Sequence, residues 1–121
     1  AVSPDGQYIA CVELDARTQS WRAAIVPIAG GEARRLFDVP TLQIPRQNWQ
    51  KVKWSADGRS LFYLTDANGA TVLRSASLDG NIVEDVASFP AEKVFSYDLR
   101  DGVLACSRSP VTSDIVLLTP F

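Results

Sequence analysis

The sequence predicts an all-β fold: a β-propeller fragment of about three four-stranded antiparallel blades, the last of which lacks its outer strand. Three segments resemble one another, namely SPDGQYIACVEL at 3–14, SADGRSLFYLTD at 55–66 and RDGVLACSRS at 100–109. Their Asp-Gly pairs begin at positions 5, 57 and 101, so they are 52 and 44 residues apart. Periods of about 40–50 residues with short strands are typical of propeller blades. No segment has helical periodicity.

The strands follow from the alternation of apolar and polar residues around turn signals. We expect strands at 7–14, 21–28 and 32–37 in the first repeat and at 51–55, 60–65, 71–77 and 82–86 in the second. The third repeat has strands at 94–99, 103–107 and 114–118. Ala1 and Val2 are the remainder of an innermost first strand, and the third repeat stops before a fourth strand. The blades therefore span 1–39, 40–88 and 89–121.

Residue pairs that end in glycine mark the connections between strands. Asp-Gly closes the first hairpin of each repeat, and Gly takes the positive φ that other residues resist. The second hairpins carry Gly30-Gly31 and Asp79-Gly80, which we interpret as two-residue turns. The run Asp66-Ala67-Asn68-Gly69 lacks the later ligands of a calcium loop, so we interpret it as a hairpin turn as well.

Aligning the repeats predicts the state of the two cysteines. If Leu99 corresponds to Trp54, one residue is missing from the third turn and Leu104 corresponds to Leu61. Cys11 and Cys106 then occupy equivalent positions two blades apart. Equivalent positions two blades apart are too distant for a disulfide, which needs Cα atoms within about 7 Å. We therefore expect two free, largely buried thiols.

Composition excludes several classes of function. The chain has no histidine, which removes Ser–His and Cys–His nucleophile pairs and His-ligated zinc. We expect no catalysis, no cofactor and no metal site, although Asp98 and Asp101 could meet a cation. The net charge of −2 argues against nucleic acid as a partner. Apolar runs such as the one at 115–118 have only the length of a strand, so we expect no membrane contact by this segment.

The motif SPDG, followed by two strands, GGE and a short strand, resembles the repeats of TolB-type bacterial propellers. The propeller domains of dipeptidyl-peptidase and prolyl-oligopeptidase relatives are similar. The ending SRSPVTSDIVLL (107–118) resembles the last blade of propellers fused to bacterial serine/threonine kinases and winged-helix regulators. These resemblances imply a noncatalytic sensor, scaffold or interaction module. Two alternatives are a propeller that gates the catalytic domain of an oligopeptidase and a purely structural stack of blades.

Propeller topology gathers the long connections on one rim. The segments 38–50, 15–20 and 109–113 lie there, whereas the Asp-Gly and Gly-Gly turns lie on the opposite face. Recognition commonly uses adaptable loops on a rigid scaffold, with Trp and Arg as anchors. We therefore expect a protein or small ligand to contact a set of residues on this rim: Arg17, Gln43, Arg46, Gln47 and Trp49. The alternative is that Trp49 packs down over the blade.

The two ends of the chain are unfinished as propeller blades. The chain begins without methionine, and both terminal blades are incomplete, so we interpret it as a piece of a larger protein. Blades are stable only when neighbours cover their faces. We therefore expect either the remaining parental blades or a second copy of the chain, in a homodimer, to cover the open ends.

Overall fold

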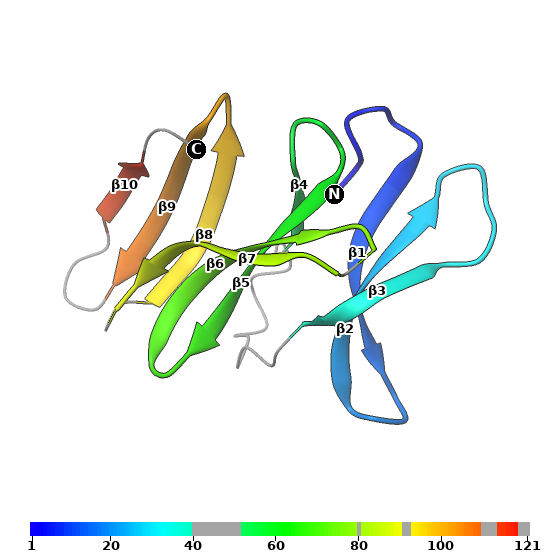
Figure 1. The fold of residues 1–121 in the computed structure, drawn as a ribbon, viewed down its shortest axis with the longest axis horizontal. Coiled ribbons are helices and arrows are strands. Elements are labelled where there is room, and N and C mark those ends of the chain that lie inside the picture. The colour runs from blue at the N-terminus through cyan, green and yellow to red at the C-terminus, as the bar shows by residue number, and fades with distance from the viewer. Residues whose placement is uncertain (40–51, 80, 91–92, 110–113, 119–121) are drawn as a thin grey trace.

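A computed structural model describes residues 1–39, 52–79, 81–90, 93–109 and 114–118, which contain strands and no helices. The strands form three antiparallel sheets that lie side by side (Figure 1). The first sheet has the order β1-β2-β3, the second β4-β5-β6-β7, and the third β10-β9-β8. The chain is therefore all-β, as predicted. The strand bounds are β1 (Tyr8–Asp15), β2 (Ser20–Pro27), β3 (Arg34–Val39), β4 (Val52–Trp54), β5 (Ser60–Ala67), β6 (Ala70–Ser77), β7 (Val83–Phe89), β8 (Lys93–Arg100), β9 (Val103–Ser109) and β10 (Asp114–Leu118).

The first two residues continue the first sheet. Val2 forms an antiparallel bridge with Ile9. The amide of Ala10 donates a hydrogen bond to the carbonyl of Ala1 over 2.7 Å, and the amino group of Ala1 donates to the carbonyl of Ala10 over 2.8 Å. Ala1 and Val2 thus take the place of an innermost strand beside β1, as the sequence predicted.

The register of the hairpins confirms most of the repeat alignment. Trp54 pairs with Leu61 in the second sheet, and Leu99 pairs with Leu104 in the third. These partners are seven and five positions apart, so the third turn is two residues shorter rather than the one residue predicted. Asp101 and Gly102 both have positive φ, of 51° and 74°, which is the geometry of a two-residue turn. Asn68 and Gly69 have φ of 50° and 81°, which confirms the predicted hairpin there.

The longer turns are built on a Ser-x-Asp-Gly motif. The hydroxyl of Ser55 donates to Oδ1 of Asp57 over 2.6 Å, and the amide of Arg59 donates to the same oxygen over 3.0 Å. The amide of Ser60 donates to Oγ of Ser55 over 3.0 Å, which joins the two ends of the turn. The same network recurs in the turns that contain Ser3 with Asp5 and Ser77 with Asp79.

The second hairpins of the first two repeats are longer than predicted. The amide of Ser77 donates to the carbonyl of Ile82, so the connection around Asp79 is not a two-residue turn. The aspartate side chain must reach an amide two residues further along, and a two-residue turn leaves no room for that bond. The connection at Gly30-Gly31 is also longer, because β3 starts with Arg34, whose partner in β2 is Ile25.

Packing between the sheets buries alternate residues of each strand. On the second sheet, Leu61 and Tyr63 face the first sheet and are buried with Ala10 and Ala23 in two small clusters. The opposite face of the second sheet carries Leu64, which packs against the third sheet. Since side chains of a strand point alternately to opposite faces, a central blade has apolar residues at successive positions. This explains the near-continuous apolar run of β5.

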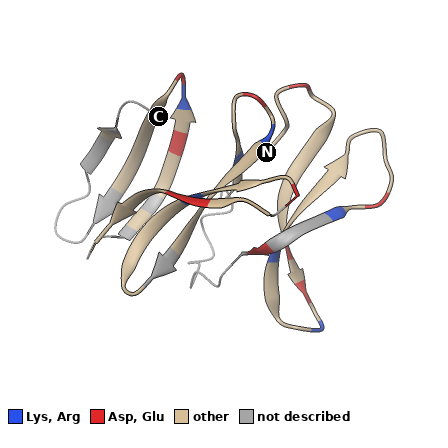
Figure 2. Ribbon diagram, viewed as in Figure 1, with Lys and Arg blue, Asp and Glu red and all other residues tan. Residues whose placement is uncertain are grey.

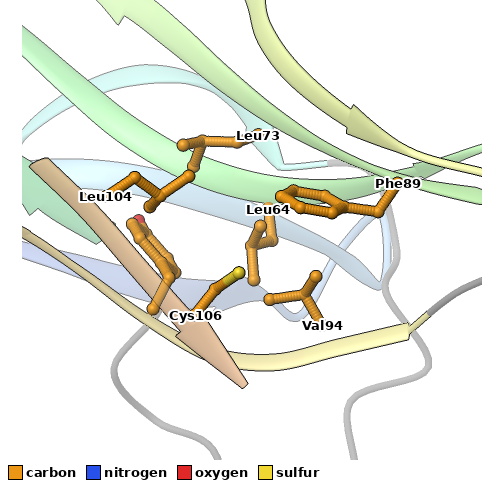
Figure 3. Packing of buried hydrophobic residues seen from close by; sticks show 7 residues of the cluster. Leu64, Leu73, Phe89, Val94, Leu104 and Cys106 are labelled. Atoms are coloured by element: carbon orange, nitrogen blue, oxygen red, sulfur yellow. The ribbon is translucent and has the colours of Figure 1, made fainter. Parts of the chain in front are cut away.

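The largest cluster lies between the second and third sheets (Figure 3). Leu73 and Leu104 are 0% and 1% exposed at its centre. The phenol of Tyr97 also lies in this cluster, and it donates a hydrogen bond to the carbonyl of Phe62 over 2.8 Å. Burial raises the pKa of Tyr97, and the nearby Asp98 carboxylate raises it further. The phenol therefore links strands of two sheets as a neutral donor.

Neither cysteine forms a disulfide, as predicted. Cys106 is buried between the second and third sheets. Cys11 is only half-buried, which differs from the prediction. Its neighbours in sequence, Ala10 and Val12, face the second sheet, so Cys11 points to the opposite side of the first sheet. Among the described residues, no sheet covers that side.

Candidate functional site

One end of the first sheet brings together the rim segments that the structure describes. Asp15 pairs with Ser20 where β1 turns into β2, and Trp21 pairs with Val39 at the end of β3. The strand end that leads into residues 40–51 therefore lies beside the turn that carries Arg17. The Ser-x-Asp-Gly turns lie at the opposite ends of the strands (Figure 1).

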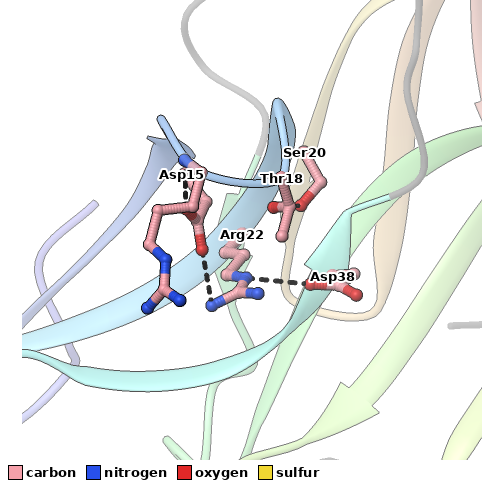
Figure 4. Close-up of polar contacts among 6 residues, drawn as sticks. Asp15, Thr18, Ser20, Arg22 and Asp38 are labelled. Carbon is pink, nitrogen blue, oxygen red and sulfur yellow. Dashed lines mark hydrogen bonds and ion pairs between the residues drawn. The ribbon is translucent and has the colours of Figure 1, made fainter.

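An arginine between two aspartates organises this rim. Arg22 contacts Oδ2 of Asp15 through its terminal nitrogen at 2.9 Å and Oδ1 of Asp38 through Nε at 3.1 Å (Figure 4). Arg22 and Asp38 are also cross-strand partners in the register of β2 and β3. Ion pairs at such partly exposed positions contribute about 0–1 kcal/mol each. Their main consequence here is positional, because they hold the β1–β2 turn and the end of β3 together.

The turn between β1 and β2 is held by local hydrogen bonds. The amide of Arg17 donates to Oδ1 of Asp15 over 2.8 Å, and the hydroxyls of Thr18 and Ser20 are 2.6 Å apart (Figure 4). Gln19 has a positive φ of 56°, and its amide donates to the carbonyl of Asp15 over 2.8 Å. The turn therefore holds its backbone in one conformation and exposes Arg17, whose guanidinium can bind carboxylates or aromatic faces.

The structure describes only one of the five residues predicted to contact a partner. Arg17 is exposed on the rim, where the topology predicted it. Gln43, Arg46, Gln47 and Trp49 fall in residues 40–51 and lie outside the described residues. Their grouping with Arg17, and the alternative in which Trp49 packs down over the blade, both remain predictions.

Asp98 has a cationic partner within the protein. Nζ of Lys53 lies 3.2 Å from Oδ1 of Asp98, so the carboxylate that could have met a cation already pairs with a lysine. In the described part of the chain, no group of three or more His, Cys, Asp or Glu residues could hold a metal ion. The described residues also contain no helix long and apolar enough to cross a membrane.

Sequence reasoning missed the residues that stiffen the rim and the sheets. Arg22 and its two aspartates could have been found, because opposite charges on adjacent strands pair once the strands are aligned. The same signal would have found Arg74 with Asp85, whose atoms Nε and Oδ1 are 2.6 Å apart. The hydrogen bond from Tyr97 to the backbone of Phe62 has no sequence signal, since it joins groups of two different sheets.

Comparison with known proteins supports the fold. No protein-family model and no curated protein matches this sequence. Among solved structures, the chain is similar to the β-propeller domain of the Trilobed protease from Pyrococcus furiosus, a domain described as having an open velcro topology. The TM-score is 0.58 at 15% sequence identity, and the match covers 98% of this chain and 38% of that one. The three sheets are therefore part of a β-propeller fold.

Proposed function

We propose that this chain is a noncatalytic part of a TolB-type bacterial propeller that serves as a binding scaffold or sensor module in a larger protein. The proposal rests on the geometry of the rim of the first sheet. There, Arg22 joins Asp15 and Asp38, and a hydrogen-bonded turn exposes Arg17 beside the strand end that leads into residues 40–51. A stiff scaffold that presents an exposed arginine beside a long connection suits recognition better than chemistry. The chain has no histidine to act as a general base.

A second candidate function is a propeller that belongs to a protease and controls access to its catalytic domain. The compared structure is the propeller domain of a protease, which favours this candidate by fold alone. This chain would again bind rather than catalyse, and the rim would face the catalytic domain. The two candidates differ in the partner: a separate protein or ligand in the first, and a hydrolase domain of the same polypeptide in the second.

Cross-linking in cells tests the rim. A photo-reactive amino acid at position 17 of the full-length parent protein should form a specific cross-link, and one at position 84, which is exposed on β7, should not. Combining the probe at 17 with Arg46→Ala and Trp49→Ala should reduce the cross-link several-fold while the melting temperature stays unchanged. Mass spectrometry of the product identifies the partner and separates the two candidates. Equal cross-linking at 17 and 84 would contradict the proposal.

We also propose that other blades, from the parent or from a second copy, cover the open side of the first sheet. Ile9 and Cys11 on that side are equivalent to Leu61 and Tyr63, which are 0% and 3% exposed between the first two sheets, yet Ile9 is 39% exposed. Val2, at 59% exposure, adds to this apolar side. These apolar positions are buried in the second repeat and exposed in the first. This difference favours a further blade as the partner that covers the open side of the first sheet.

Light scattering tests this association. The isolated chain at micromolar concentration should scatter as a dimer of its 13.2 kDa mass, with the first sheet of each copy against the third sheet of the other. Ile9→Lys should shift the equilibrium toward monomer, whereas Glu84→Lys on the exposed face of β7 should not. A folded monomer at every concentration would contradict self-association. The open side would then have to be covered by the parental blades, which co-purification would test.

A further inference from the structure

A cleft lies between the first and second sheets, on the face of the Ser-x-Asp-Gly turns and opposite the rim. Its volume is about 430 Å³, which is within the range of small-ligand sites. The two turns that form one end of the cleft lie close together, since a Cβ added to Gly58 would lie 3.7 Å from Cδ of Pro4. We call this space the inter-blade cleft.

Aromatic and aliphatic side chains form its walls. Tyr8, Ile25 and Pro27 come from the first sheet, and Trp54 and Leu78 come from the second. The indole N–H of Trp54 is already donated to the carbonyl of Ala1 over 3.0 Å. The indole therefore offers a ligand its π surface rather than a hydrogen-bond donor, and such a surface attracts cations.

The charged groups of the cleft favour a cation as well. Asp5, Glu32 and Asp57 supply three carboxylates against the single guanidinium of Arg34, which leaves an excess of two negative charges. Hydrogen bonds from Ser3 and from the amide of Gln7 lower the pKa of Asp5. Those from Ser55 and the amide of Arg59 do the same for Asp57.

Both aspartates in the cleft are therefore ionised at neutral pH. Their turn hydrogen bonds are accepted by Oδ1, so a cation can approach through Oδ2. The acidic residues of these turns are grouped at one end of the first two sheets (Figure 2).

The neighbouring hollow between the second and third sheets has a different balance. Its volume is about 650 Å³, and its charged side chains are two carboxylates, Asp57 and Asp101, and two cations, Lys53 and Arg100. The charges of these side chains cancel there. Negative charge combined with aromatic walls therefore distinguishes the inter-blade cleft from this hollow. The hollow serves as an internal control for the cleft.

We infer that the inter-blade cleft binds an arginine side chain of a partner protein segment. A guanidinium is planar, stacks on aromatic rings and pairs with carboxylates through several N–H donors. The aliphatic stem of the arginine packs against Ile25, Pro27 and Leu78. This site lies on the opposite face from the rim, so it goes beyond the proposed function and does not depend on the identity of the rim partner.

A short capped peptide with a central arginine and leucine neighbours tests the inference on the folded chain. The same peptide with citrulline, which is neutral and has nearly the same shape, is the matched probe. Binding is followed by NMR of the indole N–H of Trp54 and by the salt dependence of the affinity. We expect saturable binding of the arginine peptide that weakens with salt, and binding of the citrulline peptide that is weaker by about tenfold.

Two variants locate the site. Asp5→Asn, in the inter-blade cleft only, keeps the oxygen that accepts the turn hydrogen bonds but removes the charge, so it should weaken arginine-peptide binding by about three- to tenfold. Asp101→Asn, in the neighbouring hollow only, should leave the affinity unchanged. Circular dichroism and melting temperature check that both variants are folded. Equal affinity for the arginine and citrulline peptides would overturn the inference, as would absent binding or an equal effect of the two variants. Cross-linking from position 17 tests the rim independently of these results.

Discussion

Replacing Leu73 by alanine should lower the free energy of unfolding by about 2–5 kcal/mol, measured by chemical denaturation at a fixed protein concentration. Leu73 is 0% exposed and belongs to the cluster between the second and third sheets. Its removal leaves a cavity whose lining cannot collapse, because strands on both sides are held by their own ladders. The loss is therefore the sum of a transfer free energy and a cavity cost.

Leu117→Ala is the matched control for this change. It removes the same atoms from a side chain that is 67% exposed in β10, on the side of the third sheet that faces away from the second. With both leucine variants made in the monomeric Ile9→Lys background, where no second copy covers that side, we expect a change within about 0.5 kcal/mol. A small effect of Leu73→Ala, comparable with that of Leu117→Ala, would mean that the second and third sheets do not pack through this cluster. The denaturant slope should stay the same in both variants, since the surface exposed on unfolding is nearly unchanged.

Raising the pH above 10 should destabilise the protein through Tyr97. Burial raises the pKa of this phenol in the folded state, so the folded protein keeps the proton while the unfolded chain releases it. The stability is complete below the unfolded pKa of about 10 and is lost as the pH rises above it. Each retained proton costs about 1.4 kcal/mol per pH unit, or roughly 3 kcal/mol by pH 12. Burial also raises the pKa of Tyr63, which adds in the same direction.

Tyr97→Phe separates this effect from general alkaline unfolding. At neutral pH the variant should be about 1 kcal/mol less stable, because it loses the hydrogen bond to the carbonyl of Phe62. Above pH 10 the variant releases one proton fewer than the wild type on unfolding, so its stability should decline less steeply with pH. The two curves of stability against pH should therefore cross. Denaturation curves at several pH values between 7 and 12 measure both slopes. Parallel curves throughout would contradict a buried, neutral phenol.

Local sequence predicted the strands and most of their pairing. Alternation placed strands within two or three residues of their observed ends, and the Asp-Gly signals located the hairpins. These features depend on neighbours in the chain and on the two-residue period of a strand, both of which are visible in the sequence. The equivalence of Leu61 with Leu104 followed from the same alternation, and it explained why Cys11 and Cys106 do not form a disulfide.

Turn chemistry was predicted less completely. A Gly pair indicates a turn, yet the length of the turn depends on which backbone groups an adjacent side chain can reach. Ser77 and Asp79 bind amides further along the chain, so their hairpin is longer than the Gly signal indicated. Asp101 has no serine two residues before it, and its turn is the tight one that Asp-Gly favours.

The sequence by itself determined that this chain forms propeller blades, because a repeat of strands and turns needs only local patterns. Only the tertiary structure decided which face of each blade is covered and where a ligand can enter. The inter-blade cleft joins Tyr8 of the first sheet to Trp54 of the second, and a hydrogen bond joins Tyr97 of the third sheet to the backbone of Phe62 in the second. Such contacts unite residues that are distant in the chain, and their distances depend on how far one twisted sheet is rotated against the next, which no local pattern encodes.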